Sequence, residues 1–280
     1  MSNKNQSSRL TFQHKASQGV VGIFGDAAKL HDKNVGAVTA LVKEQLERQY
    51  PKLSFRHRME VTKSEINEYL KKIDSELGQT LFVKNSSIKP DGGILEVQDD
   101  SGCWRIILVA EAKHQGKDIA NIGQGLLVGA KNNQDLMAAG NAIERSHKNI
   151  AEIANFMLKE SHFPYILFLE GSNFLTETIT ICRPDGRVVT LDCNSGMLNR
   201  LDRLTAANYG MQINKNLCKN KFVSHGDKAI MLQATSIFTP GNGQPWDKEV
   251  MFNIMYDVAI TSLQSLGSDL FYQLTNAEDE

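Results

Sequence analysis

The chain lacks any long apolar stretch and any apolar leader at its start. A membrane-spanning helix needs roughly 18 or more consecutive apolar residues, and no run in the sequence approaches that length. The opening segment MSNKNQSSRLTFQHKASQ has no apolar core of the kind that a secretory signal carries. We therefore expect a globular chain that works in the cytoplasm and has no contact with a membrane.

Cysteines are few, and the charges nearly balance. The four cysteines, Cys103, Cys182, Cys193 and Cys218, show neither a C-x-x-C spacing nor a neighbouring histidine pair. That spacing argues against a zinc site and for reduced thiols. A net charge of −1 gives no overall sign of a polyanionic partner, but residues 183–228 hold eight basic and four acidic side chains. This local excess of positive charge is compatible with contact to phosphates.

A β-hairpin is the most clearly patterned feature of the sequence. Its legs are expected at Gly92–Gln98 and Trp104–Ala112, and the turn formers Asp-Asp-Ser-Gly at 99–102 lie between them. A short loop centred there would place Asp91 opposite Ala110 or Glu111.

Three charges converge at the end of this hairpin. Because side chains alternate along a strand, Glu111 and Lys113 share one face, and Asp91 from the other leg joins them. Two hard oxygen ligands beside an ammonium suit Mg²⁺ held against a phosphate. An acid and a lysine two residues apart are more often a surface ion pair, but here the apolar run Ile106–Ala110 leads directly into the charges. A buried strand end of this kind favours a functional site.

The remaining periodicities indicate an α/β protein. A capping box, Thr62 with Glu65, opens one of the helices. A second hairpin with polar and apolar residues alternating is expected around the turn Arg-Pro-Asp-Gly-Arg at 183–187. Helices are expected around Gly19–Leu30, Val35–Gln49, Lys63–Ile73, from Asn141 onward and at Val250–Leu266, and strands at Leu81–Val83, Phe163–Leu169 and Ala229–Ile237.

A segment of unusual composition, Asp135–Arg145, precedes and begins the helix from Asn141. Its Asn, Glu and Arg residues lie next to the small residues Ala138, Ala139 and Gly140. A helix start of this composition can enter a DNA groove, because the small residues let the backbone approach base edges closely. The alternative is a plain solvated helix face, which helix propensity alone would favour.

These features resemble a known family. The pattern Pro90-Asp91…Glu111-x-Lys113 is that of the PD-(D/E)-x-K nuclease superfamily. The runs SSIKPDGG (86–93), VAEAKHQGKDI (109–119), QDLMAAGNAIERSHKNI (134–150), ESHFPYILFLEGSNFLTE (160–177) and NRLDRLTAANYGM (199–211) resemble the EcoRI-type family of type II restriction endonucleases, colinearly along nearly the whole chain.

The resemblance implies a fold and an activity. The fold would be a restriction-endonuclease-like α/β domain spanning residues 1–280, with a central five-stranded mixed sheet flanked by helices. The hairpin at 176–194 would be an arm that wraps DNA. Residues 1–17 hold Lys4, Arg9 and Lys15 and no acid, and this composition predicts a mobile basic arm. The activity would be that of a bacterial homodimer that cuts double-stranded GAATTC between G and A with Mg²⁺ and leaves 5′-phosphate ends. A cognate DNA adenine methyltransferase would act on the same site without binding the enzyme.

The resemblance also assigns roles to residues. Asp91, Glu111 and Lys113 match the catalytic residues, and Asp91, Glu111 and the Ala112 carbonyl match the metal ligands. Asn can bond adenine and Arg can bond guanine through base edges, and the residues matching the base-recognition set are Met137, Ala138, Gly140, Asn141, Ala142, Glu144, Arg145, Arg200 and Arg203. The residues matching DNA-phosphate contacts are Lys89, Lys117, Lys148 and Asn149.

Three places depart from the family pattern: Gly123-Gln124, Ala130-Lys131 and Asp192. They bear on a phosphate or dimer contact rather than on the catalytic residues. Two alternatives stay open, a DNA-binding relative that does not cleave and a repair or junction nuclease that recognises DNA structure. The three charged residues together argue against the first, and the segment Met137–Arg145 argues against the second.

Overall fold

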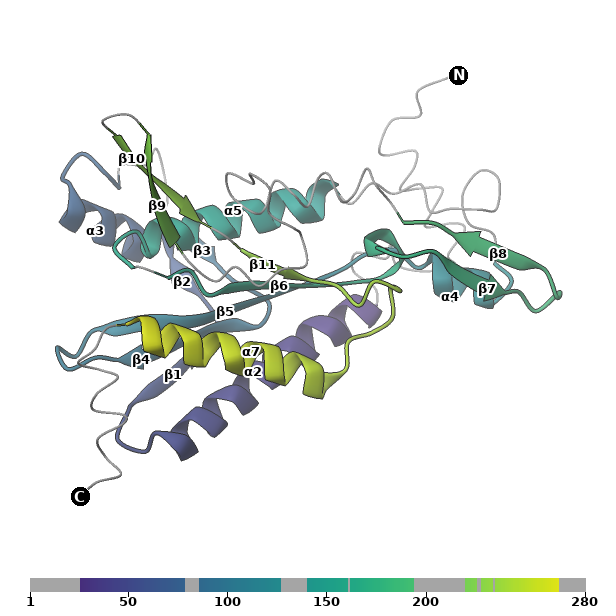
Figure 1. Ribbon diagram of the computed structural model, residues 1–280, viewed down its shortest axis with the longest axis horizontal. Coiled ribbons are helices and arrows are strands. Elements are labelled where there is room, and N and C mark those ends of the chain that lie inside the picture. Colours follow the sequence, from purple (N-terminus) through teal and green to yellow (C-terminus); the bar gives the residue numbers. More distant parts are fainter. Residues whose placement is uncertain are drawn as a thin grey trace.

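The structure, a computed structural model of the chain, describes most of the protein (Figure 1). It covers residues 26–78, 86–126, 140–160, 162–193, 220–225, 228–233 and 235–266, with the backbone alone for 140–145 and 220–233. The expected arm at 1–17 and the expected strand at Leu81–Val83 lie outside these ranges. The expectation of a single domain over 1–280 stays a prediction.

A five-stranded mixed sheet forms the centre of the fold. Its strand order is β1-β4-β5-β6-β11. The pairs β1–β4 and β4–β5 are antiparallel, whereas the pairs β5–β6 and β6–β11 are parallel. The strands are β1 (Phe55–Arg58), β4 (Gly93–Gln98), β5 (Trp104–His114), β6 (Tyr165–Glu170) and β11 (Ser236–Phe238). This confirms the expected α/β fold with its central mixed sheet.

Helices cover both faces of the sheet (Figure 1). On one face, α2 (Asp26–Gln49) and α7 (Lys248–Ser265) pack against side chains such as Leu108 and Ala110 of β5. On the other face, α3 (Lys63–Ile73) and α5 (Gly140–Phe156) pack against Val109 and Leu167. All six residues of β6 are buried, as expected for a strand with helices on both sides.

Helix α2 corrects one expectation. Instead of two helices at 19–30 and 35–49, the described chain forms one helix from Asp26 to Gln49. Residues 19–25 of the first expected helix lie outside the described residues. Between the two expected helices, His31 is 2% exposed and belongs to the buried stripe of the continuous helix. For α3 the expected bounds and the Thr62–Glu65 capping box are both confirmed.

The β4–β5 hairpin forms as expected, and its register near the tip is the expected one, but a β-bulge shifts the register by one residue toward its base. Val97 pairs with Arg105, whereas beyond a β-bulge Leu95 pairs with Leu108 and Gly93 with Ala110. Asp91 therefore lies before the strand and not opposite Ala110 or Glu111, so that part of the expectation was wrong. The bulge adds one residue, Ile107, to β5, which the turn chemistry at the tip does not signal.

The bulge decides which face the end of β5 presents. Ile106 packs with α3 and α5, while the two consecutive residues Ile107 and Leu108 both pack with α2 and α7. From Val109 onward the alternation resumes, shifted by one residue. Without the bulge, Glu111 and Lys113 would lie on the α2–α7 face instead of facing α5.

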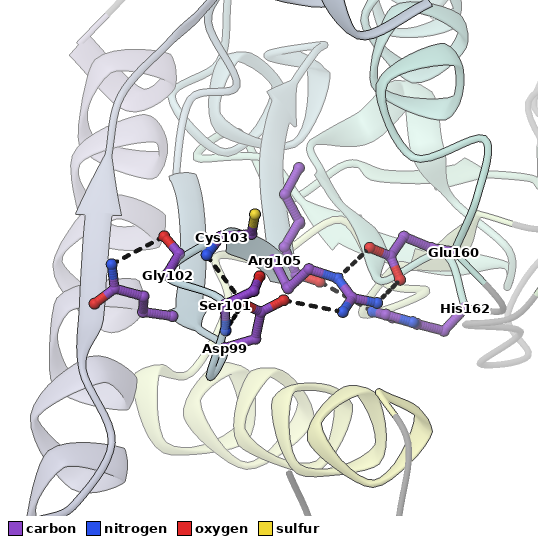
Figure 2. Close-up of polar contacts among 9 residues, drawn as sticks. Asp99, Ser101, Gly102, Cys103, Arg105, Glu160 and His162 are labelled. Carbon is purple, nitrogen blue, oxygen red and sulfur yellow. Dashed lines mark hydrogen bonds and ion pairs between the residues drawn. The ribbon is translucent and has the colours of Figure 1, made fainter. Parts of the chain in front are cut away.

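The tip of this hairpin is held by local polar contacts (Figure 2). One carboxylate oxygen of Asp99 accepts hydrogen bonds from the Ser101 amide and hydroxyl and from the Cys103 amide, at 3.0, 2.6 and 2.9 Å. Its other oxygen lies 3.4 Å from Arg105, whose guanidinium also binds both oxygens of Glu160 at 2.5 Å. The turn is therefore anchored to the segment that precedes β6.

Smaller elements surround the sheet. Residues 229–237, expected as one strand, divide between β10 and the sheet strand β11. Three pairs of strands lie outside the central sheet: β2 (Val61–Thr62) with β3 (Ser87–Ile88), β7 (Ile179–Cys182) with β8 (Val188–Leu191), and β9 (Asn220–His225) with β10 (Lys228–Gln233). Two short helices are α4 (Asp118–Gly123) and the 3-10 helix Ser172–Phe174. Within the described ranges, no helix has the length and apolar character to cross a membrane.

Candidate catalytic centre

Asp91 is placed by a tight turn that the Pro-Asp-Gly-Gly sequence makes possible. The Gly93 amide donates to the Pro90 carbonyl at 2.9 Å and the Gly92 amide to the Ala110 carbonyl at 2.9 Å. A Cβ on Gly92 would lie 2.6 Å from Val35 and 2.8 Å from Ala110, and Gly93 has a φ of +80°. Only glycines therefore let the chain pass so close to β5 and α2 while presenting Asp91 beside the end of β5.

The Lys113 ammonium brings three oxygens together. Its Nζ lies 2.6 Å from Asp91 Oδ2, 2.6 Å from Glu111 Oε1 and 2.8 Å from the Ala112 carbonyl oxygen. These are the three groups that the sequence singled out as metal ligands. The convergence of Asp91, Glu111 and Lys113, expected from the hairpin, is thus present in the structure despite the shifted register.

Lys113 is charged in this setting. Burial alone would lower the pKa of its ammonium, but the attraction of Glu111 and then Asp91 outweighs burial and raises the pKa above its usual value. The side chain is 18% exposed. At neutral pH Lys113 is therefore a hydrogen-bond donor and a positive charge, not a proton acceptor.

Glu111 is fully buried and receives donors on both carboxylate oxygens. Asn149 on α5 donates to Oε1 at 3.3 Å and to Oε2 at 3.0 Å, and the Ser146 hydroxyl lies 3.5 Å from Oε1. The Tyr165 hydroxyl on β6 donates to Oε2. A buried carboxylate needs such partners, because in the protein interior it has lost those it had in water.

A second polar cluster fixes the backbone just beyond Lys113. Glu170, at the end of β6, lies 2.8 Å from His114 Nδ1 and 3.0 Å from His31 Nδ1. Burial would raise the pKa of Glu170, but the two histidines lower it to about 2. His31 Nε2 also contacts the Phe168 carbonyl at 3.1 Å, so both ring nitrogens of His31 lie against oxygen atoms of β6.

Asp32 is a further acid beside the centre. Burial first, and then the negative charge of Asp91, raises the pKa of this half-buried carboxyl to about 6, against the opposing attraction of Lys113 and His31. It lies on the first turns of α2, the helix whose Val35 packs over Gly92. Asp32 therefore adds to the negative potential at the site without contacting Lys113.

The donor set fits a hard divalent cation. Two carboxylates and one backbone carbonyl already surround a positive charge at 2.6–2.8 Å. Among the described residues, no three His, Cys, Asp or Glu side chains gather as a complete metal cage. A site with few protein oxygens, completed by water and a phosphate, is the kind that Mg²⁺ occupies, whereas a closed cage of protein ligands is not.

The expected DNA-binding residues are only partly covered. Met137, Ala138, Arg200 and Arg203 lie outside the described residues, and Gly140, Asn141, Ala142, Glu144 and Arg145 form the first turns of α5 with their side chains undescribed. Of the phosphate set, Lys148 is exposed on α5, Lys117 occupies the N-cap position of α4, and Lys89 pairs with Glu60 at 2.6 Å. Asn149 instead contacts Glu111, which sequence reasoning did not anticipate.

The hairpin β7–β8 projects beside α4, to one side of the sheet in Figure 1. Its expected turn is confirmed: the Gly186 amide donates to the Arg183 carbonyl at 2.9 Å, and Gly186 has a φ of +82°. Arg183 also donates to the Gly125 carbonyl at 2.7 Å, just beyond α4. Two of the three places that depart from the family pattern are described. Gly123 ends α4 and Gln124 is its C-cap, while Asp192 accepts a hydrogen bond from the Thr178 hydroxyl at 3.2 Å. The third, Ala130-Lys131, lies outside the described residues.

Sequence reasoning missed Tyr165, Ser146, Asp32 and Glu170. Tyr165 reads as an ordinary aromatic residue of a buried strand, and the parallel register that brings it to Glu111 joins segments more than fifty residues apart. For Tyr165 and Glu170, which begin and end the buried strand β6, the available signal was a hydroxyl or an acid at the end of an otherwise apolar element. Such a signal identifies a polar group but not its partner.

Comparisons with known proteins agree with this geometry. The family model described as restriction endonuclease EcoRI matches residues 17–273. The chain is 72% identical to the type II restriction enzyme EcoRI of Escherichia coli over 276 residues, which cover 99% of this chain and all of that protein. It is 49% identical to the type II restriction enzyme RsrI of Cereibacter sphaeroides over 267 residues, or 95% and 96% of the two chains. A match of this extent, together with the Asp91–Glu111–Lys113 centre, shows that the chain belongs to the EcoRI family of type II restriction endonucleases.

Proposed function

We propose that this site-specific endonuclease acts as a Mg²⁺-dependent homodimer that recognises double-stranded GAATTC and cuts each strand between G and A. Membership of the family supports the general part of this proposal, a restriction endonuclease that binds duplex DNA and uses a divalent metal. The observation that supports the reaction is the convergence of the Asp91, Glu111 and Ala112 oxygens on the Lys113 ammonium. The reaction is hydrolysis by in-line attack of water, leaving a 5′-phosphate and a 3′-hydroxyl.

Each residue of the centre has a distinct task. Asp91, Glu111 and the Ala112 carbonyl would hold the divalent ion. When bound, such an ion polarises a phosphoryl oxygen and lowers the pKa of an attacking water. Lys113 would donate a hydrogen bond to the scissile phosphate or to the water and offset negative charge that develops during attack.

Recognition is assigned to the segment that leads into α5 and to two arginines. Met137, Ala138, Gly140, Asn141, Ala142, Glu144, Arg145, Arg200 and Arg203 would contact base edges, where each good contact discriminates by about 1–3 kcal/mol. The backbone of α5 links this segment to Asn149, one of the residues that bind Glu111. The helix that would read bases is therefore continuous with the helix that holds a catalytic carboxylate.

Phosphate contacts would fix the register of the duplex. Lys148 is exposed one residue before Asn149, which suits it to a phosphate beside the catalytic centre. Lys89 would exchange its ion pair with Glu60 for a phosphate, and Lys117 would contribute from the start of α4. Asn149 would reach a phosphate only by giving up a bond to Glu111.

Symmetry and setting complete the proposal. A palindromic hexamer read identically on both strands calls for a two-fold dimer with an isologous interface. The residues 1–17 and 176–194 would be arms that embrace the duplex. A DNA adenine methyltransferase would protect the same sequence in the bacterial cytoplasm without binding this protein.

Digestion of phage DNA with Mg²⁺, followed by sequencing of the cut ends, tests the proposal. We expect discrete fragments whose ends all derive from G^AATTC, and no products when the metal is chelated. A smear of products, or cutting confined to branched substrates, would favour a structure-specific nuclease. Binding without any products would favour a DNA-binding protein that does not cleave.

A further inference from the structure

We propose that Tyr165 is a positioning residue for Glu111: its buried hydroxyl holds one carboxylate oxygen so that the other faces the cation site. This inference deepens the proposed function, because it rests on Glu111 being a ligand of the divalent ion. It adds a residue from β6 to a centre otherwise built from the turn at Asp91 and the end of β5.

The two oxygens of Glu111 have different partners. Oε1 lies 2.6 Å from Lys113 Nζ, the atom on which Asp91 and the Ala112 carbonyl also converge. Oε2 accepts from the Tyr165 hydroxyl and from Asn149 at 3.0 Å. Asn149 and Ser146 also lie 3.3 and 3.5 Å from Oε1, so the Tyr165 hydroxyl is the neutral donor that contacts Oε2 alone. Oε1 is thus the oxygen presented to the cation, and Oε2 is the one that Tyr165 holds.

A carboxylate keeps its two oxygens in these separate positions only if a rigid hydrogen-bond partner holds one of them. The terminal torsion of a glutamate side chain is broad and roughly two-fold, so packing alone does not set the orientation of its carboxylate. Both Glu111 and Tyr165 are 0% exposed, and the hydrogen-bond partners of the outer oxygen Oε2 are protein groups. Hydrogen bonds from Tyr165 and Asn149 therefore decide how the carboxylate is turned.

Tyr165 is well suited to this task because it is itself held firmly. Its ring stacks on Phe163 with centroids 5.9 Å apart, and its backbone pairs with Val109 in the parallel register of β5 and β6. Glu111 lies two residues beyond Val109 on the same face, so the tyrosine reaches it diagonally across the strands. The other donor to Oε2, Asn149, lies on the half-exposed part of α5 instead.

The test compares Tyr165→Phe with the unmodified chain by direct binding of Mn²⁺, followed by the electron paramagnetic resonance of the free ion. The variant keeps the ring and removes one hydroxyl. Loss of an outer partner of a metal ligand costs about 10- to 100-fold in metal affinity or activity, so we expect the Mn²⁺ dissociation constant to rise about tenfold. Affinity for duplex DNA without metal should change less than about twofold, because the Tyr165 side chain is fully buried and cannot contact a ligand at the surface.

Tyr69→Phe is the matched control. Tyr69 packs against Phe156 and its hydroxyl accepts from the Lys159 amide at 3.3 Å, so this variant also removes one tyrosine hydroxyl from the same layer of the fold. We expect it to bind Mn²⁺ as the unmodified chain does. In the Glu111→Gln background, Tyr165→Phe should weaken Mn²⁺ binding no further, because its effect acts through Glu111.

Three outcomes would overturn the inference: unchanged Mn²⁺ affinity in Tyr165→Phe, an equal loss in the Tyr69→Phe control, or failure of Tyr165→Phe to fold, which would make the hydroxyl a requirement of the core. The proposed function fails separately. In that case the unmodified chain itself would bind no Mn²⁺ or would not cut DNA.

Discussion

The two ends of the β4–β5 ribbon carry the same kinds of charge but use them differently. At the tip, both carboxylate oxygens of Asp99 accept hydrogen bonds from nearby groups (Figure 2). The Arg105 guanidinium donates to one of these oxygens and also to both oxygens of Glu160. At the base, Asp91 is 28% exposed, and within the described residues Lys113 is its one side-chain partner. The charged groups at the tip are therefore all occupied with one another, whereas Asp91 at the base can still bind a ligand such as a cation.

This difference separates a structural charge cluster from a functional one. At the tip, donors within five residues of Asp99 complete a turn, and several bonds lower the pKa of its carboxyl against the opposing effect of burial. At the base, the charges come from separate elements, and the donors to Glu111 arrive from α5 and β6. Only the base presents several oxygens to one point that a ligand can take.

The largest effect should follow from removing a carboxylate at the base. Asp91→Asn or Glu111→Gln is expected to lower the single-turnover cleavage rate in Mg²⁺ by about 10³-fold or more, because each removes a charged cation ligand. Binding to the specific duplex without metal should persist. If either variant cuts at the unmodified rate, the base is no more functional than the tip.

The next effect concerns stability just beyond the base. Because the pKa of Glu170 falls from 4.5 to about 2 on folding, its contribution is full above pH 4.5 and is lost as the pH falls from about 4.5 to 2. Glu170→Gln should therefore lower the free energy of unfolding at pH 7 by about 2–3 kcal/mol and flatten its dependence on acid. Urea unfolding at a series of pH values measures both, and an unchanged pH dependence would contradict the role of His31 and His114.

At the tip we expect a smaller and purely structural effect. Asp99→Ala removes the hydrogen bonds to the Ser101 and Cys103 amides and should lower the free energy of unfolding by about 1–2 kcal/mol. The cleavage rate at saturating Mg²⁺ should stay within about twofold of the unmodified enzyme. A tenfold loss of rate with unchanged stability would show that the two ends of the ribbon are coupled.

The smallest effect has the opposite sign. Since folding raises the pKa of Asp32 from 3.8 to about 6, its charge opposes folding at pH values above 6 and has no such cost below 3.8. After allowance for partial solvent screening, Asp32→Asn should raise the free energy of unfolding at pH 7.5 by about 1 kcal/mol and leave it unchanged near pH 3.5. Urea unfolding at the two pH values tests this, and a loss of stability at pH 7.5 would refute it.

Local patterns predicted much of the fold. The Thr62–Glu65 capping box, the turn at 183–187 and the two legs of the main hairpin are each encoded within a few residues, and each forms as expected. The expected end of one helix at residue 30 and start of the next at 35 were wrong. His31 in the joining turn contacts Glu170, more than a hundred residues away, and no local pattern shows that partner. The strand expected at 229–237 divides because part of it joins β9 and part joins β6.

By itself, the sequence determined which charged residues are the candidates for the chemistry: the two acids and the lysine follow from the alternation of side chains on β5 and from the Pro-Asp-Gly-Gly turn. Only the tertiary structure decided which face of the sheet they take and which groups hold them. The bulge at Ile107 turns Glu111 toward α5, and the parallel pairing of β5 with β6 brings Tyr165 to it. Strand register and non-local donors arise from packing between distant segments, and a single-chain pattern carries no measure of that packing.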